Sequence, residues 1–291
     1  MAIQAKTRNL GIRIAGRIAN LFDRRKVSPV FIVGSGRSGT SILLNTVRKS
    51  ARLVSHGEGH FFPIINVLEQ ANATFYHRNR GRAVNDRHML HHVPPGQVTN
   101  LTRHLVRRIY KDVYGHREFV DKTPGLQGIK SIASMQGVFP SMHVIYAQRR
   151  GLEVVRSAML KFPEVGFKTH CEIWRDCVMT WRDIRPELDC PFLEVDQYEI
   201  LHNPEKVTEQ LAHLLGFSDR QKGQMLTCFQ VDRPQSSGDL NQVPKSIDEL
   251  GWTAQQIGEF RAVCGPAMEV CGYSETETYY SEARLDKRSA E

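Results

Sequence analysis

A short apolar run followed by a glycine-rich turn and an apolar-periodic helix constrains the fold of this chain more than any other stretch. It covers residues 31–44 and reads Phe-Ile-Val-Gly-Ser-Gly-Arg-Ser-Gly-Thr-Ser-Ile-Leu-Leu. Gly34, Gly36 and Gly39 permit positive φ angles, which let successive backbone N–H groups point inward. A helix that starts near Ser38 adds the positive end of its dipole. The stretch therefore predicts a phosphate-binding turn between a strand and a helix.

The spacing of Gly34 and Gly39 is that of a Walker A loop, but the next residue is Thr40, where that loop has lysine. The Walker lysine reaches the β and γ phosphates, and the following hydroxyl residue holds magnesium. Here Thr40 and Ser41 supply hydroxyls, and the cation, Arg37, lies inside the loop. We expect a nucleotide whose end group is neutralised by an arginine and backbone amides without a metal. The alternative is a glycine-rich turn of some other nucleotide-binding domain.

The composition indicates one α/β domain. The chain has 291 residues, of which 41% are hydrophobic, and this is enough for one large core. No apolar run approaches the roughly 20 residues that span a bilayer, and the first residues lack the apolar region and cleavage site of a signal peptide. We therefore expect a cytoplasmic protein. The six cysteines form no C-x-x-C pair, so reduced, mostly buried thiols are expected.

Residues 1–28 form a basic arm, with seven lysines and arginines against one aspartate. Most of the net charge of +8 lies there. Leu10, Ile14, Ile18 and Leu21 recur at helical spacing, which predicts a basic amphipathic helix. Such a helix either makes a peripheral contact with an anionic membrane or packs loosely on the edge of the domain. No nucleic-acid partner is expected, because no basic stripe interleaved with aromatic residues accompanies the arm.

A polar stretch follows the predicted phosphate helix. It holds Glu58 and His60 between glycines, just ahead of Phe61 and Phe62. In an open parallel sheet, ligands lie outside the carboxyl ends of the strands, so this loop can face the ligand of the first loop. Glu58 and His60 are therefore candidate catalytic residues. The alternative is a solvated glutamate in a glycine-rich loop.

Residues 76–118 are basic and rich in histidine, with a helical run from Asn100 to Tyr114. His88 and His92 have the i, i+4 spacing of a metal-binding pair, but no matching carboxylate or cysteine completes a site. No metal is predicted. We expect this segment to be an insertion that covers the pocket of an acceptor substrate.

Two further predicted strands end in polar residues. Residues 119–124 begin apolar and finish with Asp121, Lys122, Thr123 and a proline, as a strand does when it leaves the core at a functional edge. Residues 139–149 predict a turn and a buried strand with Arg149 at its end. Ser157 falls in the first turns of the next helix, so its hydroxyl and the arginine can converge on one phosphate.

These motifs resemble, in the same order, those of the sulfotransferase family, which uses the sulfate donor PAPS (3′-phosphoadenosine 5′-phosphosulfate). Residues 37–44 resemble its 5′-phosphosulfate loop, and residues 121–124 resemble its (Glu/Asp)-Lys-(Ser/Thr)-Pro motif. Residues 58–62 are similar to the acceptor loop of the heparan-type carbohydrate sulfotransferases, whose glutamate is the general base. Residues 192–205 resemble the family's next strand and the motif (Tyr)-Glu-x-Leu-x-x-(Asp/Asn)-Pro-Glu that follows it.

The position of Arg149 and Ser157 matches the family's 3′-phosphate site, with one departure. The family usually has Arg-Asp-Pro-Arg at this turn, whereas this chain has Arg149, Arg150, glycine and leucine. The sequence therefore leaves open which of Arg149, Arg150 and Arg156 contacts the phosphate. Residues 233–238 are expected to pass back over the nucleotide.

The resemblance covers residues 29–273 and implies a three-layer α/β/α domain with a mainly parallel sheet, similar to the P-loop NTPases. We assign residues 1–28 to the arm, 29–275 to the sulfotransferase domain and 276–291 to a charged tail that frays after Thr278.

The implied reaction is in-line transfer of a sulfuryl group from PAPS to a hydroxyl of a carbohydrate, lipid or small-molecule acceptor, without a metal. Glu58 is the expected base and His60 its rival, while Lys122 neutralises sulfate oxygens or orients the acceptor and Arg37 stabilises the leaving group. The residues expected to bind the donor are Gly36, Arg37, Ser38, Gly39, Thr40, Ser41, Arg149 and Ser157. The alternatives are a P-loop kinase or NTPase and a catalytically idle nucleotide-binding adaptor.

Overall fold

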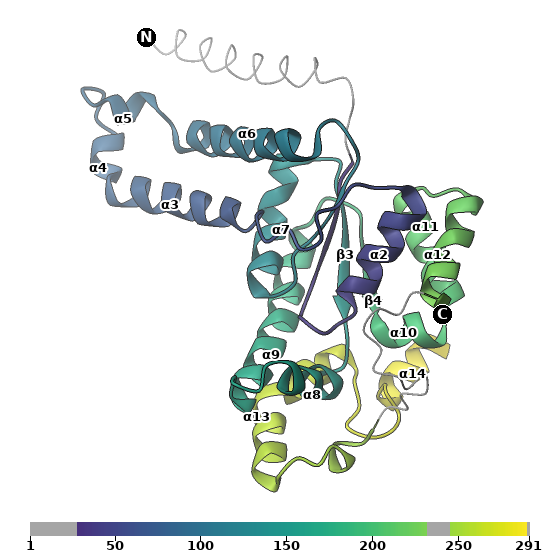
Figure 1. The fold of residues 1–291 in the computed structure, drawn as a ribbon. Helices are drawn as coiled ribbons and strands as arrows, with labels where there is room; N and C mark the ends of the chain where they lie inside the picture. The colour runs from purple at the N-terminus through teal and green to yellow at the C-terminus, as the bar shows by residue number, and fades with distance from the viewer. Residues whose placement is uncertain (1–27, 232–244, 290–291) are drawn as a thin grey trace.

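The computed structural model describes residues 28–231 and 245–289 (Figure 1). Its centre is a sheet with the strand order β2-β1-β3-β4, in which all three pairings are parallel. The strands are β1 (Val30–Gly34), β2 (Val120–Lys122), β3 (His143–Gln148) and β4 (Phe192–Asp196). The predicted basic arm, up to residue 27, and the segment expected over the nucleotide, residues 233–238, lie outside the described residues.

Helices connect and flank these strands. In chain order they are α2 (Thr40–Ala51), α3 (Ile64–Arg78), α4 (Arg80–Ala83), α5 (Met89–His92), α6 (Pro95–Tyr114), α7 (Leu126–Val138), α8 (Gly151–Lys161), α9 (Phe167–Ile184), η1 (Arg185–Glu187), α10 (Gln197–His202), α11 (Pro204–Leu215), α12 (Asp219–Val231), η2 (Ile247–Glu249), α13 (Ala254–Cys271) and α14 (Glu282–Ser289).

The central strand β1 is buried along its whole length, as expected for a parallel strand covered on both faces. Successive side chains of a strand point to opposite faces. Phe31 and Val33 belong to a core with residues of α6, α7 and α9, whereas Val30 and Ile32 belong to a second core with residues of α2, α11 and α12. Helices therefore cover both faces of the sheet, which confirms the predicted three-layer α/β/α fold with a parallel sheet.

Two helices end at glycines in the left-handed conformation. The helix α11 begins at Pro204 and is followed by Gly216 in the left-handed conformation, with φ of 64°. The helix α13 starts with a capping box formed by Thr253 and Gln256 and stops at Gly272, with φ of 63°. Glycine reaches this conformation without the steric penalty that a side chain brings, so both stops were readable from the sequence.

A third cluster of buried residues lies beside the sheet, between α8, α9 and α13 (Figure 1). It includes Tyr279 and Tyr280, whose side chains are buried. The Tyr280 hydroxyl donates to Glu199 at 2.8 Å, and α14 follows. The expected fraying after Thr278 is therefore wrong at these two residues. Their rings bury apolar surface and their hydroxyls donate to carboxylates, although the surrounding segment is charged.

The histidine-rich segment belongs to a projecting pair of long helices, α3 and α6, joined at their far end by α4 and α5 (Figure 1). We call residues 64–114 the helical hairpin. Its base is anchored by Ile65, Val106 and Tyr110, which join the core beneath α7. The predicted helix at Asn100 begins earlier, at Pro95, because proline is well tolerated in the first turn of a helix.

All six cysteines are free thiols, and four of them are buried. Burial raises the pKa of Cys177 to about 12 and that of Cys190 to about 11, so both stay protonated and unreactive near neutral pH. Among the residues that the structure describes, no helix combines the length and the apolar character needed to cross a bilayer.

Candidate active site

The glycine-rich turn between β1 and α2 requires its glycines at two positions. Gly34 has φ of 149°, and a Cβ there would lie 2.2 Å from the carbonyl oxygen of Ala147 on β3. Gly39 has φ of 88°, and α2 begins directly after it, at Thr40. Arg37, a residue with a side chain, also adopts a left-handed conformation with φ of 68°. Such strained residues are concentrated at ligand-binding turns, where the surrounding fold holds them.

Arg37 lies inside this turn and reaches across to α8. Its Nε donates to the Ser157 hydroxyl at 2.9 Å, and its carbonyl oxygen accepts from a guanidinium nitrogen of Arg149 at 3.2 Å. The structure thus brings Arg37 together with two residues more than a hundred positions further along the chain. The sequence analysis assigned Arg37 to one end of the donor and Arg149 and Ser157 to the other. The turn after β1 and the turn after β3 are therefore in direct contact through their arginines.

Arg149 also carries a buried polar atom that has no partner among the described residues. Its Nε is buried and makes no hydrogen bond within the described residues. Leaving a buried charged donor unsatisfied costs free energy, so such an atom in a native fold indicates a missing partner. An anion bound beside Arg149 would supply it.

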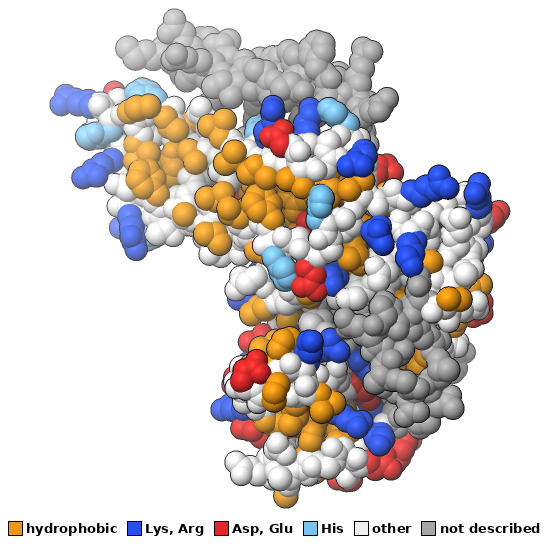
Figure 2. Space-filling view, in the orientation of Figure 1, with side chains coloured by type: hydrophobic (Ala, Val, Ile, Leu, Met, Phe, Trp, Pro, Cys, Tyr) orange, Lys and Arg blue, Asp and Glu red, His pale blue; other side chains and the backbone are white. Residues whose placement is uncertain are grey.

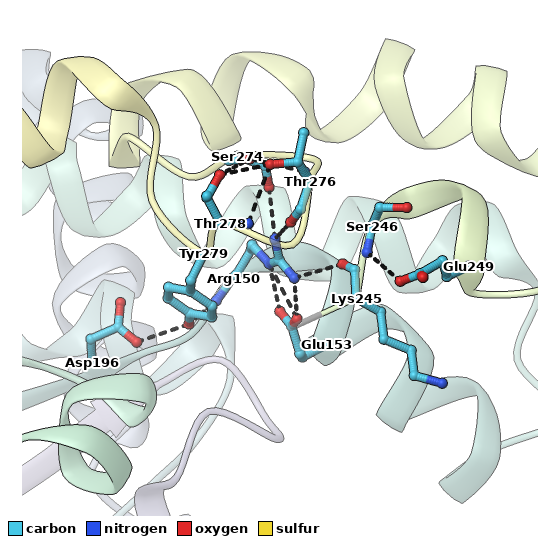
Figure 3. Close-up of polar contacts among 10 residues, drawn as sticks. All are labelled: Arg150, Glu153, Asp196, Lys245, Ser246, Glu249, Ser274, Thr276, Thr278 and Tyr279. Carbon is cyan, nitrogen blue, oxygen red and sulfur yellow. Dashed lines mark hydrogen bonds and ion pairs between the residues drawn. The ribbon is translucent and has the colours of Figure 1, made fainter. Parts of the chain in front are cut away.

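Arg150 has an entirely different environment, although it is the next residue. Its side chain is fully buried, and its guanidinium donates to the Glu153 carboxylate at 3.0 Å and to backbone oxygens (Figure 3). The oxygens belong to Lys245, Ser274 and Thr276. Arg150 is therefore committed to holding the C-terminal segment, and it is not available to a phosphate. Arg156, the third candidate, is exposed on α8.

The turn that carries Arg149 and Arg150 is held by residues that the sequence did not single out. The Arg150 backbone N–H donates to the Tyr279 hydroxyl at 2.8 Å, and this hydroxyl donates to the buried Asp196 at 2.9 Å (Figure 3). Trp174 donates from Nε1 to the Arg149 carbonyl at 3.1 Å. Burial raises the pKa of Asp196, while hydrogen bonds, the first from Tyr273, oppose that shift. The turn is fixed before any ligand arrives.

The loop with Glu58 runs beside the edge strand β2. Glu58 forms a parallel bridge with Lys122, and the Gly59 N–H donates to the Lys122 carbonyl at 2.9 Å. A Cβ on Gly59 would lie 2.3 Å from the Asp121 carboxylate oxygens, so glycine is required for this close approach. Asp121 is in turn fixed by Tyr110 of the hairpin, which donates to it at 2.8 Å. The loop is thereby held against the carboxyl end of β2.

Lys122 joins the Glu58 loop to the phosphate turn. Its Nζ donates to Glu58 Oε1 at 2.7 Å and to the Ser41 hydroxyl, on the first turn of α2, at 2.9 Å. The lysine side chain is only 5% exposed, whereas that of Glu58 is 47% exposed. The carboxylate therefore faces solvent, and a buried cation separates it from the donor turn.

His60 lies on the other side of the same carboxylate. Its Nε2 is 2.8 Å from Glu58 Oε2, and its backbone N–H donates to the Thr123 hydroxyl at 3.0 Å. The hydrogen bond from Lys122 has the largest effect and holds the pKa of Glu58 below its ordinary value of 4.5. Burial opposes this shift, and the hydrogen bond from His60 adds a smaller lowering. Glu58 is therefore ionised at neutral pH, as a proton acceptor must be.

No group of three histidine, cysteine or carboxylate side chains is placed to bind a metal ion in the part of the chain that the structure describes. His88 and His92 lie at the far end of the hairpin, at the two ends of the short helix α5. The His92 ring nitrogen Nε2 contacts the Asp86 carbonyl at 3.0 Å.

A parallel α/β sheet with a glycine-rich turn after β1, a second arginine after β3 and an ionised glutamate beside β2 defines a P-loop-like α/β fold. The family model described as "Sulfotransferase family" matches residues 29–221. The chain therefore belongs to the sulfotransferase family.

Solved structures agree with this assignment at the level of the fold. The chain is similar to sulfotransferase STF9 from Mycobacterium avium, with 12% identity, a TM-score of 0.52, and coverage of 87% of this chain and 79% of that one. It is also similar to the sulfotransferase domain of the Synechococcus PCC 7002 olefin synthase, with 19% identity, a TM-score of 0.50, and coverage of 87% and 97%. A search of curated proteins finds no significant match.

Proposed function

We propose that this protein transfers a sulfuryl group from PAPS to an acceptor hydroxyl, with Glu58 as the general base. The observation that carries the proposal is the chain of contacts from Glu58 through Lys122 to Ser41. It connects a solvent-facing proton acceptor to the turn suited to the leaving phosphate. A kinase or NTPase is disfavoured, because the position of the Walker lysine holds Thr40, which is buried.

The residues present fit both charged ends of PAPS, which supplies the sulfuryl group and leaves as adenosine 3′,5′-bisphosphate (PAP). The backbone amides of the turn from Gly36 to Ser41, together with Arg37, suit the 5′-phosphosulfate. Arg149, with its unpartnered Nε, and Ser157 suit the 3′-phosphate. The direct contact between Arg37 and Ser157 supports the proposal that a single nucleotide occupies both sites.

In the proposed reaction the acceptor oxygen forms a bond to sulfur, and the bond from sulfur to the 5′-phosphate oxygen breaks. Glu58 takes the acceptor proton, and Arg37 with the loop amides stabilises the charge that develops on the leaving phosphate. The Lys122 ammonium has three N–H donors, and two of them meet Glu58 and Ser41. The third is suited to a sulfate oxygen. His60 orients Glu58, or replaces it as base.

PAP should stabilise the folded protein more than AMP or ATP with magnesium, because those nucleotides lack the 3′-phosphate that Arg149 and Ser157 would contact. A hundredfold excess over Kd contributes about 2.7 kcal/mol. Thermal unfolding with each nucleotide measures the difference. Equal shifts with PAP and AMP, or a response to ATP that requires magnesium, would contradict a PAPS-type site.

Arg149→Ala should raise the KM for PAPS more than it lowers kcat, because Arg149 would hold a part of the donor remote from the reacting sulfur. Isothermal titration of PAP should show the corresponding loss of affinity. Arg156→Ala, on the exposed face of α8, is the matched control and should keep both values. If Arg156→Ala lost PAP affinity and Arg149→Ala kept it, the 3′-phosphate site would lie at Arg156 instead.

A further inference from the structure

The far end of the helical hairpin has a composition that neither the fold nor the proposed reaction explains. We call residues 78–92 the hairpin tip. Its cations are Arg78, Arg80, Arg82 and Arg87, all exposed, and its only acidic residue is Asp86. No ion pair to any of these arginines is formed within the described residues. An unneutralised cationic cluster at the end of a projecting element suits a negatively charged partner.

Large apolar side chains are exposed between these arginines. Val84 is 78% exposed and Met89 is 81% exposed, and Phe75 of α3 is 52% exposed. Figure 2 shows hydrophobic side chains in a band along the hairpin, with lysine and arginine side chains at its far end. Scattered exposed apolar residues are ordinary, but a contiguous group ringed by charge marks an interaction site.

A pocket of about 490 Å³ opens within this band, between α3, α5 and α6. It is lined mainly by apolar side chains, including Leu68, Phe75 and Met89. The polar side chains of the lining are already engaged within the hairpin: Tyr76 donates to the Val93 carbonyl at 2.5 Å, and Asn72 donates to Thr99 at 2.9 Å. The pocket therefore suits an occupant without polar atoms, such as a hydrocarbon chain.

We propose that the hairpin tip docks on an anionic lipid bilayer, with its arginines at the phosphate headgroups and with Val84, Met89 and the pocket in contact with acyl chains. Charge complementarity selects this occupant, because arginine near an anionic leaflet and apolar side chains at the headgroup boundary contribute together. A second copy of the chain would bring two cationic tips together, which is unfavourable. A nucleic acid would leave the apolar pocket without an occupant.

The test uses the full chain and sedimentation with vesicles of phosphatidylcholine alone or mixed in equal parts with phosphatidylglycerol. Wild-type protein should bind the mixed vesicles and release them as salt is raised, since the Debye length shortens. Arg80→Gln/Arg82→Gln/Arg87→Gln should weaken binding on the order of 100-fold. Val84→Ser/Met89→Ser should weaken it roughly tenfold or more.

Matched controls come from exposed residues on other elements. Lys161→Gln/Lys168→Gln/Arg220→Gln removes the same charge, and Leu160→Ser/Val231→Ser removes apolar side chains that are 78% and 75% exposed. Both controls should bind as wild type does. Binding that is equal on neutral vesicles, that survives both tip variants, or that is absent altogether would overturn the proposal. Loss of a dimer in the tip variants, measured by sedimentation velocity, would assign the tip to a second copy instead.

Discussion

Replacing Glu58 with glutamine is expected to lower kcat by roughly 10²- to 10⁴-fold, the usual contribution of a general base, while the affinity for PAP stays unchanged. Glutamine keeps the size and the hydrogen-bonding reach of the side chain but cannot accept the acceptor proton. The donor affinity should survive because Glu58 contacts Lys122 and His60, whereas the proposed donor contacts are Arg37, Arg149 and Ser157. Steady-state kinetics on an identified acceptor and calorimetry with PAP measure the two quantities.

His60→Ala is the matched control, because His60 contacts the same carboxylate from the other side. If Glu58 is the base, this variant should lose far less of kcat than Glu58→Gln. Near wild-type turnover in Glu58→Gln together with a large loss in His60→Ala would transfer the role of base to the histidine.

The pH profile gives an independent check on the same assignment. Lys122 holds the pKa of Glu58 below its ordinary value of 4.5, so the carboxylate stays ionised as the pH falls to that value. The acid limb of kcat should therefore lie below pH 4.5, and protonation of Glu58 should abolish turnover beneath it. Lys122→Met removes the largest cause of this shift and should move the acid limb to higher pH. An acid limb unaffected by Lys122→Met would mean that another group limits the rate.

Replacing Arg150 with methionine is expected to destabilise the protein by about 3–5 kcal/mol, the usual cost of removing one partner of a buried ion pair. The substitution leaves the Glu153 carboxylate without its cation and leaves carbonyl oxygens of Lys245, Ser274 and Thr276 without a donor (Figure 3). Thermal or urea unfolding without nucleotide measures the loss, which should appear as a fall in Tm of roughly 5–8 °C.

Arg156→Met is the matched control, since this arginine is exposed on the same helix. It should change the free energy of unfolding by no more than about 0.5 kcal/mol. The double variant Arg150→Met/Glu153→Leu should recover part of the loss, because it removes the unpaired carboxylate. Wild-type stability in Arg150→Met, combined with weak PAP binding, would show that Arg150 is a ligand of the phosphate and not a structural residue.

Much of the fold was predictable because local signals agreed with the tertiary structure. The continuous apolar run of β1, the glycines at 34 and 39, and the stops at Gly216 and Gly272 are all determined by backbone geometry within a few residues.

The contacts within the candidate site were harder to predict than its residues. Glu58, Lys122 and Ser41 were all predicted as site residues, but with separate roles. Their contact depends on the bridge between residues 58 and 122 beside β2. A single parallel bridge between residues 64 positions apart leaves no periodic pattern in the sequence. The roles of these residues in catalysis stay predictions.

Arg150 shows why the resemblance to a motif leaves some positions open. Several acceptors of its guanidinium are backbone oxygens, and any residue type supplies such an oxygen, so the sequence carried no sign of them. Tyr279 was overlooked because the composition around it is charged. Two adjacent tyrosines in a charged segment were the one available signal, since aromatic side chains usually bury their apolar surface.

The same C-terminal contacts have a consequence for how the protein is made. Arg150 and Asp196 leave the ribosome well before Tyr279 and Thr276 are synthesised, yet these later residues satisfy their buried charge. During translation the sheet and the helices up to α12 can already assemble. We expect the nascent chain to persist as an incomplete intermediate, with a charged gap beside α8 that is open to chaperones and proteases until its last aromatic residues emerge.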